Sequence, residues 1–290
     1  MKLEMKNLSK KYASYHALKE VDLSLKPGLY GLLGANGAGK STLFKLICGL
    51  IRADAGSIKF DGKDTAKNLD EFLSNVGYLP QDFTYYPEFT GLKFMRYMAA
   101  LKGVSERKAE PLCVKLLELV GLAPQMKKKI KSYSGGMKQR LGIAQALIGD
   151  PKILILDEPT VGLDPKERVR FRNLLSSFSS EKIVILSTHI VSDVEYIADE
   201  IILLKQGGVI DMGAADELTQ EIEHCVWEVM VNAREVREIA AGLTICNQRS
   251  SSEGQGMILR IVNEIQPLPD ARRVPATLED LYMFYFGNEA

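Results

Sequence analysis

An eight-residue stretch constrains the fold of this 290-residue chain more than any other feature. It reads Gly34-Ala35-Asn36-Gly37-Ala38-Gly39-Lys40-Ser41 and fits the pattern G-x-x-x-x-G-K-[ST] at each fixed position. A short apolar run, Gly28–Leu33, precedes the stretch, and a segment with helical spacing, Lys40–Leu50, follows it. Strand, glycine-rich loop and helix, in this order, form the setting of a phosphate-binding loop. The sequence therefore predicts an α/β fold built around such a loop.

The residue types in this loop suit the phosphates of a nucleoside triphosphate. Glycines let the backbone bend so that successive N–H groups point at phosphate oxygens, and the following helix presents its positive N-terminal end to the same anion. We expect Lys40 to reach the β- and γ-phosphates and the Ser41 hydroxyl to ligate Mg²⁺. The candidate nucleotide-binding residues of this segment are Gly34, Asn36, Gly37, Ala38, Gly39, Lys40, Ser41 and Thr42.

Two buried-strand patterns further along the chain indicate a sheet with a parallel core. Ile153–Leu156 and Ile183–Leu186 are short runs rich in β-branched residues, and the segment Val169–Phe178 between them fits an amphipathic helix. Strands that alternate with helices favour parallel pairing through helical crossovers. The first 27 residues and Asp54–Asp61 fit short strands and turns beside that core.

Two acidic residues, Asp157 and Glu158, follow the first of these strands. A strand end beside the phosphate-binding loop is where a further Mg²⁺ ligand is needed, and Asp157 suits that role. Glu158 would then lie near the γ-phosphate, where a carboxylate can orient or deprotonate a water molecule. An acidic turn explains the pair equally well by itself, but the phosphate-binding loop upstream favours the catalytic interpretation.

The rest of the chain divides into a helical insertion and a small C-terminal extension. We predict a main domain over residues 1–220, with a helical insertion at about residues 90–148, and an α+β extension over residues 221–290. The elements expected in the extension are strands at Cys225–Val231 and Met257–Val262, a short helix at Arg234–Ala241, a loop at Gln248–Gly256 and a closing helix at Leu278–Phe286 capped by Thr277. The extension is too small for a large core and is expected to pack on the main domain or on a second copy.

Composition excludes several classes of protein. Lys plus Arg and Asp plus Glu both number 37, so the net charge is zero, whereas a general nucleic-acid binder carries a basic excess. The apolar runs are far shorter than the roughly 20 residues of a membrane-spanning helix, and the first residues do not fit a secretory signal. Four widely spaced cysteines fit reduced thiols in a cytoplasmic protein.

The segment Tyr133–Arg140, which reads Tyr-Ser-Gly-Gly-Met-Lys-Gln-Arg, resembles the signature motif of ATP-binding cassette (ABC) proteins. Ser134, Gly135 and Gly136 would offer a hydroxyl, unobstructed amides and a helix N-terminus, which suit a second phosphate site. In the family, two cassettes pair head to tail, and each signature closes on the nucleotide of its partner. The resemblance therefore implies a site that only a dimer completes.

The resemblance covers about residues 1–220 and implies further roles. Gln81 would contact Mg²⁺ and the attacking water, His189 would contact the γ-phosphate, and Tyr12 would stack on adenine. Gly162–Asp164 resembles the segment that passes between the two sites. The residues expected in catalysis are Glu158, His189 and Gln81, and those expected to hold Mg²⁺ are Ser41, Gln81 and Asp157.

The family implies a P-loop NTPase core with a small antiparallel β subdomain and a helical signature subdomain. It implies an ATPase subunit on the inner, cytoplasmic face of the cell membrane, paired with a second ABC ATPase subunit and with integral membrane transporter subunits, and without nucleic acid. The simplest pair is a homodimer, although pairing with a different cassette stays open. Pro275–Tyr282 resembles the C-terminal segment of exporter-type bacterial ABC ATPases that work with type-2 membrane subunits, which favours export.

Three alternatives stay open at the level of the sequence. The chain could serve an importer, or it could be a non-transport ABC protein that acts on nucleic acid or ribosomes, although the neutral net charge opposes the latter. Nucleotide could also act only as an assembly switch without hydrolysis, which the complete set of motifs opposes. The sequence does not identify a transported substrate.

Overall fold

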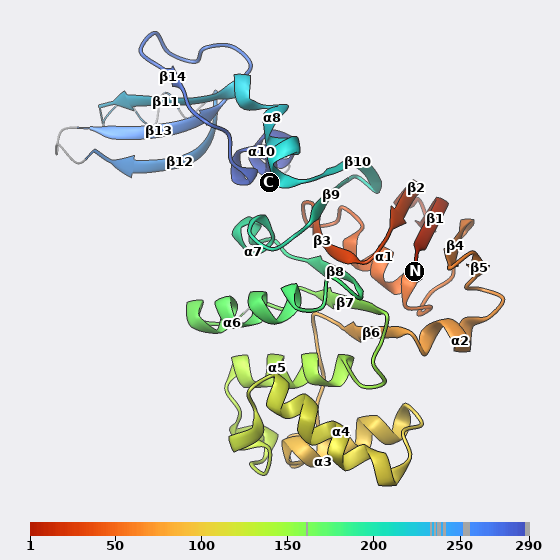
Figure 1. Ribbon diagram of the computed structural model, residues 1–290. Coiled ribbons are helices and arrows are strands. Elements are labelled where there is room, and N and C mark those ends of the chain that lie inside the picture. Colours follow the sequence, from red (N-terminus) through yellow and green to blue (C-terminus); the bar gives the residue numbers. More distant parts are fainter. Residues whose placement is uncertain are drawn as a thin grey trace.

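The computed structural model describes residues 1–160, 162–232, 234, 236, 239, 242–251 and 256–287 and arranges them in three sheets with flanking helices (Figure 1). The central sheet consists of β3 (Gly28–Leu33), β6 (Val76–Leu79), β7 (Ile153–Asp157), β8 (Ile183–Ser187), β9 (Glu200–Lys205) and β10 (Gly208–Gly213). Its strand order is β10-β9-β3-β8-β7-β6, and every pairing is parallel except that of β10 with β9. The predicted parallel core is confirmed.

Successive residues of the central strands face two different cores, which explains why these strands are apolar throughout. In β7, Ile153 and Ile155 belong to the core beneath the N-terminal sheet, whereas Leu154 and Leu156 belong to the core on the opposite face. Side chains alternate between the two faces of a strand, so a sheet covered on both sides needs apolar residues at every position.

The N-terminal sheet is antiparallel and has the order β2-β1-β4-β5. Its strands are β1 (Leu3–Tyr12), β2 (Tyr15–Leu25), β4 (Ala55–Phe60) and β5 (Lys63–Asp64). The expectation of short strands is wrong for β1 and β2, which have 10 and 11 residues. The register shifts between Met5 and Leu8, and Asn7 has a φ of 49°, so an irregularity interrupts the alternation of buried residues. One long strand therefore resembles two short ones in the sequence.

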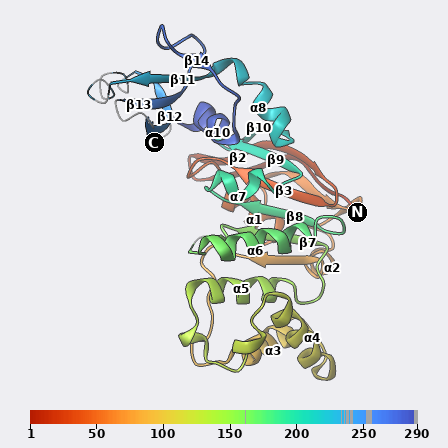
Figure 2. The same cartoon turned by 60° about the vertical axis from the view of Figure 1, so that its left-hand side comes forward.

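Helices cover the central sheet, and some of them lie beyond one end of it. They are α1 (Lys40–Ile47), α2 (Leu69–Leu73), α3 (Gly91–Leu101), α4 (Glu106–Leu119), α5 (Gly135–Ala146), α6 (Pro165–Ser176), α7 (Val191–Glu195), α8 (Ala215–Gln220) and α10 (Leu278–Phe286), with short 3₁₀ turns at Ala123–Gln125, Ile130–Ser132 and Glu223–Cys225. Helices α3, α4 and α5 contact one another and lie within residues 90–148, where the sequence predicts a helical insertion. Figures 1 and 2 show it at the end of the molecule opposite the C-terminal sheet.

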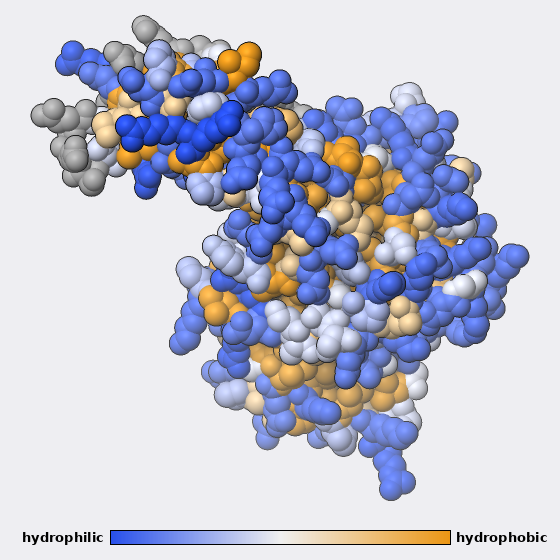
Figure 3. Space-filling model, turned by 45° about the horizontal axis from the view of Figure 1, so that its top comes forward, coloured by the Kyte–Doolittle hydropathy of each residue, from blue (hydrophilic) through white to orange (hydrophobic). Residues whose placement is uncertain are grey.

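The C-terminal sheet has the order β12-β13-β11-β14 and projects as a lobe from the rest of the molecule (Figure 3). Its strands are β11 (Val226–Val231), β12 (Thr244–Ser250), β13 (Met257–Val262) and β14 (Arg272–Arg273). Three predicted elements appear here as β11, β13 and α10, but β12 was not expected and occupies the first part of the predicted loop. Most of the helix expected at Arg234–Ala241 lies outside the described residues. The domain division near residue 220 stays a prediction.

Helix α10 follows the C-terminal sheet in sequence and contacts both that sheet, at β12 and β13, and the main body. Leu278, Leu281 and Phe286 belong to the same buried cluster as the central sheet, and α10 contacts α7 and α8. Helix α10 therefore ties the end of the chain to the main body. No helix among the described residues is long and apolar enough to cross a membrane.

Candidate nucleotide-binding site

The phosphate-binding loop lies between the end of β3 and the start of α1, as the sequence predicts. A Cβ atom at Gly34 would lie 2.3 Å from the backbone oxygen of Leu204 on β9, so only glycine fits there. Gly39 has a φ of 113°, and a Cβ atom there would lie 2.5 Å from the backbone oxygen of Ala17. These two glycines let the loop run tightly between its neighbours and open directly into the N-terminus of α1.

The Lys40 ammonium lies inside this loop. Its Nζ donates hydrogen bonds to the carbonyl oxygens of Gly34 at 2.6 Å and Ala35 at 3.0 Å. Burial lowers the pKa of Lys40, although the negative charges of Glu158 and Asp157 oppose that lowering. A buried cation whose hydrogen bonds go to carbonyl oxygens is well placed to bind an anion entering the loop.

Asp157 ends β7 and is only 4% exposed. Ser187, at the end of the neighbouring strand β8, donates a hydrogen bond from its hydroxyl to Asp157 Oδ1 at 2.6 Å. Burial raises the pKa of Asp157, and hydrogen bonds from Ser187 and Ser41 oppose that rise. A carboxylate beside the Ser41 hydroxyl supplies the oxygen ligands that Mg²⁺ prefers, so these residues fit a magnesium site.

Glu158 follows in a left-handed backbone conformation, with a φ of 49° that is uncommon for a non-glycine residue. Its backbone N–H holds this turn by donating to both the hydroxyl and the carbonyl oxygen of Ser187, each at 3.1 Å. Strained backbone of this kind persists where the surrounding structure fixes it, and it often marks a functional position. The turn leads the chain away from β7 and leaves the Glu158 carboxylate at the strand end.

Three predicted catalytic side chains meet at that carboxylate. Gln81 Nε2 donates a hydrogen bond to Glu158 Oε2 at 3.1 Å, and His189 Nδ1 lies 3.4 Å from the same oxygen. These residues come from three segments that follow the parallel strands β6, β7 and β8. The carboxyl ends of parallel strands meet at one edge of a sheet, which brings together residues far apart in the sequence.

A pocket of about 250 Å³ joins these parts. The residues that line it are Tyr12, Tyr15, Ala17, Asn36, Gly37, Ala38, Gly39, Lys40, Ser41, Thr42, Gln81, Asp157 and Glu158. Tyr12 and Tyr15 pair across the turn between β1 and β2, and the Tyr15 hydroxyl donates to the Gly37 carbonyl at 2.5 Å. Because both tyrosines border the pocket, the geometry does not distinguish Tyr12 from Tyr15 as a surface for a base.

The predicted signature residues lie elsewhere. Ser134, Gly135 and Gly136 do not occur among the described residues that line this pocket. The Ser134 hydroxyl instead caps α5 by accepting a hydrogen bond from the Met137 N–H at 3.2 Å. A Cβ atom at Gly136 would lie 3.2 Å from the Leu163 side chain, so the start of α5 abuts Gly162–Asp164. One chain therefore does not bring its signature residues to its own pocket.

Two polar residues at this site were not predicted from the sequence. Ser187 is fully buried and contacts both acidic residues, and Tyr15 borders the loop. The available signal for Ser187 was its position at the end of the strand next to that of Asp157, at the same edge of the sheet. A serine at a strand end is too common to be singled out without the register between β7 and β8, in which Asp157 pairs with Ser187.

Comparisons with known proteins show what the chain is similar to. A family model described as ABC transporter matches residues 18–161. The lantibiotic transport ATP-binding protein SrtF of Streptococcus pyogenes is 40% identical over 210 residues, which cover 72% of this chain and 89% of SrtF. The Nod factor export ATP-binding protein I of Cupriavidus metallidurans is 31% identical over 298 residues, which cover 99% of this chain and 98% of that protein.

A solved structure is also similar. It is a dimeric, post-hydrolysis state of the ATP-binding cassette MJ0796 bound to ADP and Pi. The TM-score is 0.67 and the identity 27%, and the match covers 73% of this chain and 98% of that chain.

Proposed function

The chain belongs to the ABC transporter ATP-binding proteins, and we propose that within this family it is the ATP-hydrolysing subunit of an exporter. The observation that carries the proposal is the meeting of Gln81, Glu158 and His189 beside the pocket that contains Lys40 and Asp157. Such a site combines a cradle for phosphates with a carboxylate that can accept a proton from water.

In this proposal each group of residues has a separate role in ATP hydrolysis. The loop amides and Lys40 bind the β- and γ-phosphates of ATP, and Tyr12 borders the base. Ser41, Gln81 and Asp157 would hold Mg²⁺, which neutralises charge that develops on the phosphates. Glu158 orients a water molecule in line with the γ-phosphate and takes its proton. Gln81 and His189 fix the Glu158 carboxylate because both lie within contact distance of Oε2.

We further propose that the working unit is a head-to-tail dimer, in the simplest case a homodimer. The support is that Ser134–Gly136 cap α5 away from the pocket of their own chain. A helix N-terminus with a hydroxyl and two glycines suits the γ-phosphate bound by a partner. Bound ATP would then stabilise the closed dimer, and hydrolysis would remove the γ-phosphate that bridges the two chains.

Membrane transporter subunits are the proposed further partners, so the chain would lie on the inner face of the cell membrane. An aromatic cluster soon after Gln81 supports a docking surface for them. The Tyr86 ring lies 5.0 Å from that of Phe89 and 5.4 Å from that of Tyr97, and Tyr86 and Tyr97 stay 48% and 39% exposed. An open hollow of about 760 Å³ borders Phe89, which precedes α3, and Tyr97 on α3, and it continues to α4. Exposed aromatic side chains of this kind suit the apolar face of a partner's helix.

The test of the proposed function is the substitution Glu158→Gln. It keeps the shape of the side chain and its contact with Gln81, but it removes the proton acceptor. We expect ATP hydrolysis to fall by about 10²–10⁴-fold while ATP and Mg²⁺ convert the protein to a stable dimer in size-exclusion chromatography with light scattering. Glu181→Gln, the same change at an exposed residue, is the matched control. A Glu158→Gln variant that stays monomeric at saturating ATP would contradict the dimer.

A further inference from the structure

Helix α7 supports the segment that carries His189, because it begins only two residues after that histidine. Three elements hold α7 in place. On β3, Gly31 lacks a side chain, and a Cβ atom there would lie 2.8 Å from Val194, so α7 lies directly on the sheet. On α6, Arg172 Nη1 donates to the Ser192 carbonyl at 3.3 Å. The third element is α10, at the far end of the sequence.

The contact between α10 and α7 is polar as well as apolar. The backbone N–H of Leu278, at the start of α10, donates to Glu195 Oε1 at 3.3 Å. Glu195 is the last residue of α7, so this bond joins the end of one helix to the beginning of the other. Free N–H groups at a helix start attract a carboxylate, which makes the contact directional.

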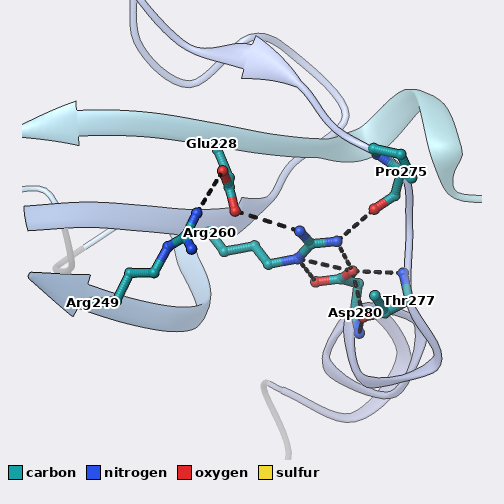
Figure 4. A network of polar contacts seen from close by, with 6 residues as sticks. All are labelled: Glu228, Arg249, Arg260, Pro275, Thr277 and Asp280. Carbon is teal, nitrogen blue, oxygen red and sulfur yellow. Dashed lines mark hydrogen bonds and ion pairs between the residues drawn. The ribbon is translucent and has the colours of Figure 1, made fainter. Parts of the chain in front are cut away.

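The start of α10 is fixed in turn by the C-terminal sheet (Figure 4). Arg260 on β13 donates from Nε to Asp280 Oδ1 at 2.8 Å and from Nη2 to Asp280 Oδ2 at 2.7 Å, and Nη2 also donates to the Pro275 carbonyl at 2.5 Å. The Asp280 carboxylate is 1% exposed and accepts further bonds from the N–H and hydroxyl of Thr277 at 2.8 and 2.7 Å. A paired, two-pronged contact of this type determines the orientation of both groups.

These contacts form a continuous series that leads from β13 to the proposed active site. Arg260 holds Asp280, Asp280 caps the start of α10, and α10 binds Glu195 on the helix that follows His189. The side-chain contacts of Glu228 offer an internal comparison. This residue lies 3.6 Å from Arg260 and 3.4 Å from Arg249, and within the part of the chain that the structure describes its ion pairs are with these two arginines rather than with residues of α7 or α10.

We propose that Asp280 and Glu195 are positioning residues of the ATPase, through which the C-terminal sheet fixes α7 and so sets the position of His189. The inference rests on the proposed function, because His189 matters only where a γ-phosphate is hydrolysed. It gives the C-terminal extension a role in the reaction, although the extension contributes no residue to the described lining of the pocket.

The experiment combines kinetics with nuclear magnetic resonance of the full chain. The protein has three histidines, so the His189 ring signals can be assigned by comparison with His16→Gln and His224→Gln. We expect Asp280→Asn and Glu195→Ala to lower kcat by about three- to tenfold and to leave KM for ATP within about twofold. The loss is smaller than the roughly hundredfold of a full misplacement because β3 and α6 still hold α7. Both variants should also shift the His189 ring signals.

Two control variants make the test specific. Glu195→Gln keeps an oxygen that accepts the Leu278 N–H and should restore kcat and the His189 signals, and Glu228→Gln should leave both unchanged. The proposal is overturned if folded Asp280→Asn and Glu195→Ala leave the His189 signals in place, whatever happens to kcat, or if Glu228→Gln shifts them equally. Should Asp280→Asn fail to fold, the comparison of Glu195→Ala with Glu195→Gln tests the proposal alone. If the wild-type chain hydrolyses no ATP, the proposed function fails, but the His189 signals still decide this inference.

Discussion

At the scale of single residues, Ser187 connects the two acidic groups of the site. Its hydroxyl donates to Asp157 and accepts from the Glu158 N–H, and the residue is fully buried. Ser187→Ala removes one donor from a buried carboxylate, which costs about 1–3 kcal/mol. We expect kcat to fall by about 10–100-fold and half-maximal activity to require a higher Mg²⁺ concentration, because the Asp157 oxygens lose their orientation.

The matched variant is Ser187→Thr, which keeps the hydroxyl. Its extra methyl group enters a fully buried position and should cost about 1–3 kcal/mol of stability, but it should leave kcat close to that of the wild type. Steady-state ATPase assays and urea titrations separate the two effects. An alanine variant that hydrolyses ATP at the normal rate would remove Ser187 from the site.

A second prediction at the scale of single residues concerns Asp280 and the way in which the stability of the folded protein depends on pH. Burial alone would raise the pKa of Asp280, but the hydrogen bonds from Arg260 and Thr277 outweigh it and hold that pKa below its usual value. An acid whose folded pKa is depressed stabilises the protein above its unfolded pKa, near 4, and this stabilisation disappears as pH falls through the folded pKa. Asp280→Asn should therefore be less stable than the wild type by about 1–3 kcal/mol at pH 7.

The difference between the two proteins should narrow as the pH falls below about 4. Urea unfolding of both proteins over a pH series measures it directly. A difference that stays constant over that range would mean that the ionised Asp280 carboxylate contributes nothing through its charge.

At the scale of elements, Ser134 has two roles that substitution can separate. Its hydroxyl caps α5, and in the proposed dimer it also faces the γ-phosphate of a partner. Ser134→Ala should cost about 1 kcal/mol of stability, whereas Ser134→Asp should cost almost none because aspartate caps helices as well as serine does. The alanine lacks the hydroxyl that would face the phosphate, and the aspartate places a negative charge opposite it. Both variants should therefore lose the ATP-dependent dimer.

Light scattering with ATP, in the Glu158→Gln background, measures the dimer, and thermal unfolding measures the cap. If Ser134→Asp dimerises as readily as the parent protein, then the start of α5 does not face a phosphate. This pair of substitutions tests the interface without relying on catalysis.

Some elements of this fold can be predicted from the sequence and others cannot. The loop before α1, the strand β7 and the helix α10 were predictable because glycine pattern, apolar runs and capping residues act locally. Strand β12 was missed because most of its residues are polar and none is buried, so pairing with β13 is what makes it a strand. Ser187 was missed for a similar reason, since its role depends on the register between two strands far apart in the sequence.

At the scale of the whole molecule, apolar burial is unevenly distributed. Two large clusters fill the two faces of the central sheet, and α10 belongs to one of them. The C-terminal sheet has a small cluster of its own, which consists of Trp227, Val229, Leu259, Ile261 and Ala271, while Val226 of β11 and Val262 of β13 belong to one of the large clusters. A region with few buried apolar contacts opens at a lower free energy than a large core. We therefore expect the C-terminal sheet to unfold before the central sheet.

The single tryptophan of the chain makes this expectation measurable. Trp227 lies on β11, is 7% exposed, and donates from its indole N–H to the Asn263 carbonyl at 2.9 Å, so its fluorescence reports the C-terminal sheet alone. In urea, the fluorescence transition should come before the far-ultraviolet dichroism transition, which is dominated by the main body. ATP with Mg²⁺ should raise the midpoint of the second transition and leave the first nearly unchanged, because a ligand stabilises the part that binds it. Coincident transitions that shift together with ATP would instead mean that Arg260 and Asp280 join sheet and body into one cooperative unit.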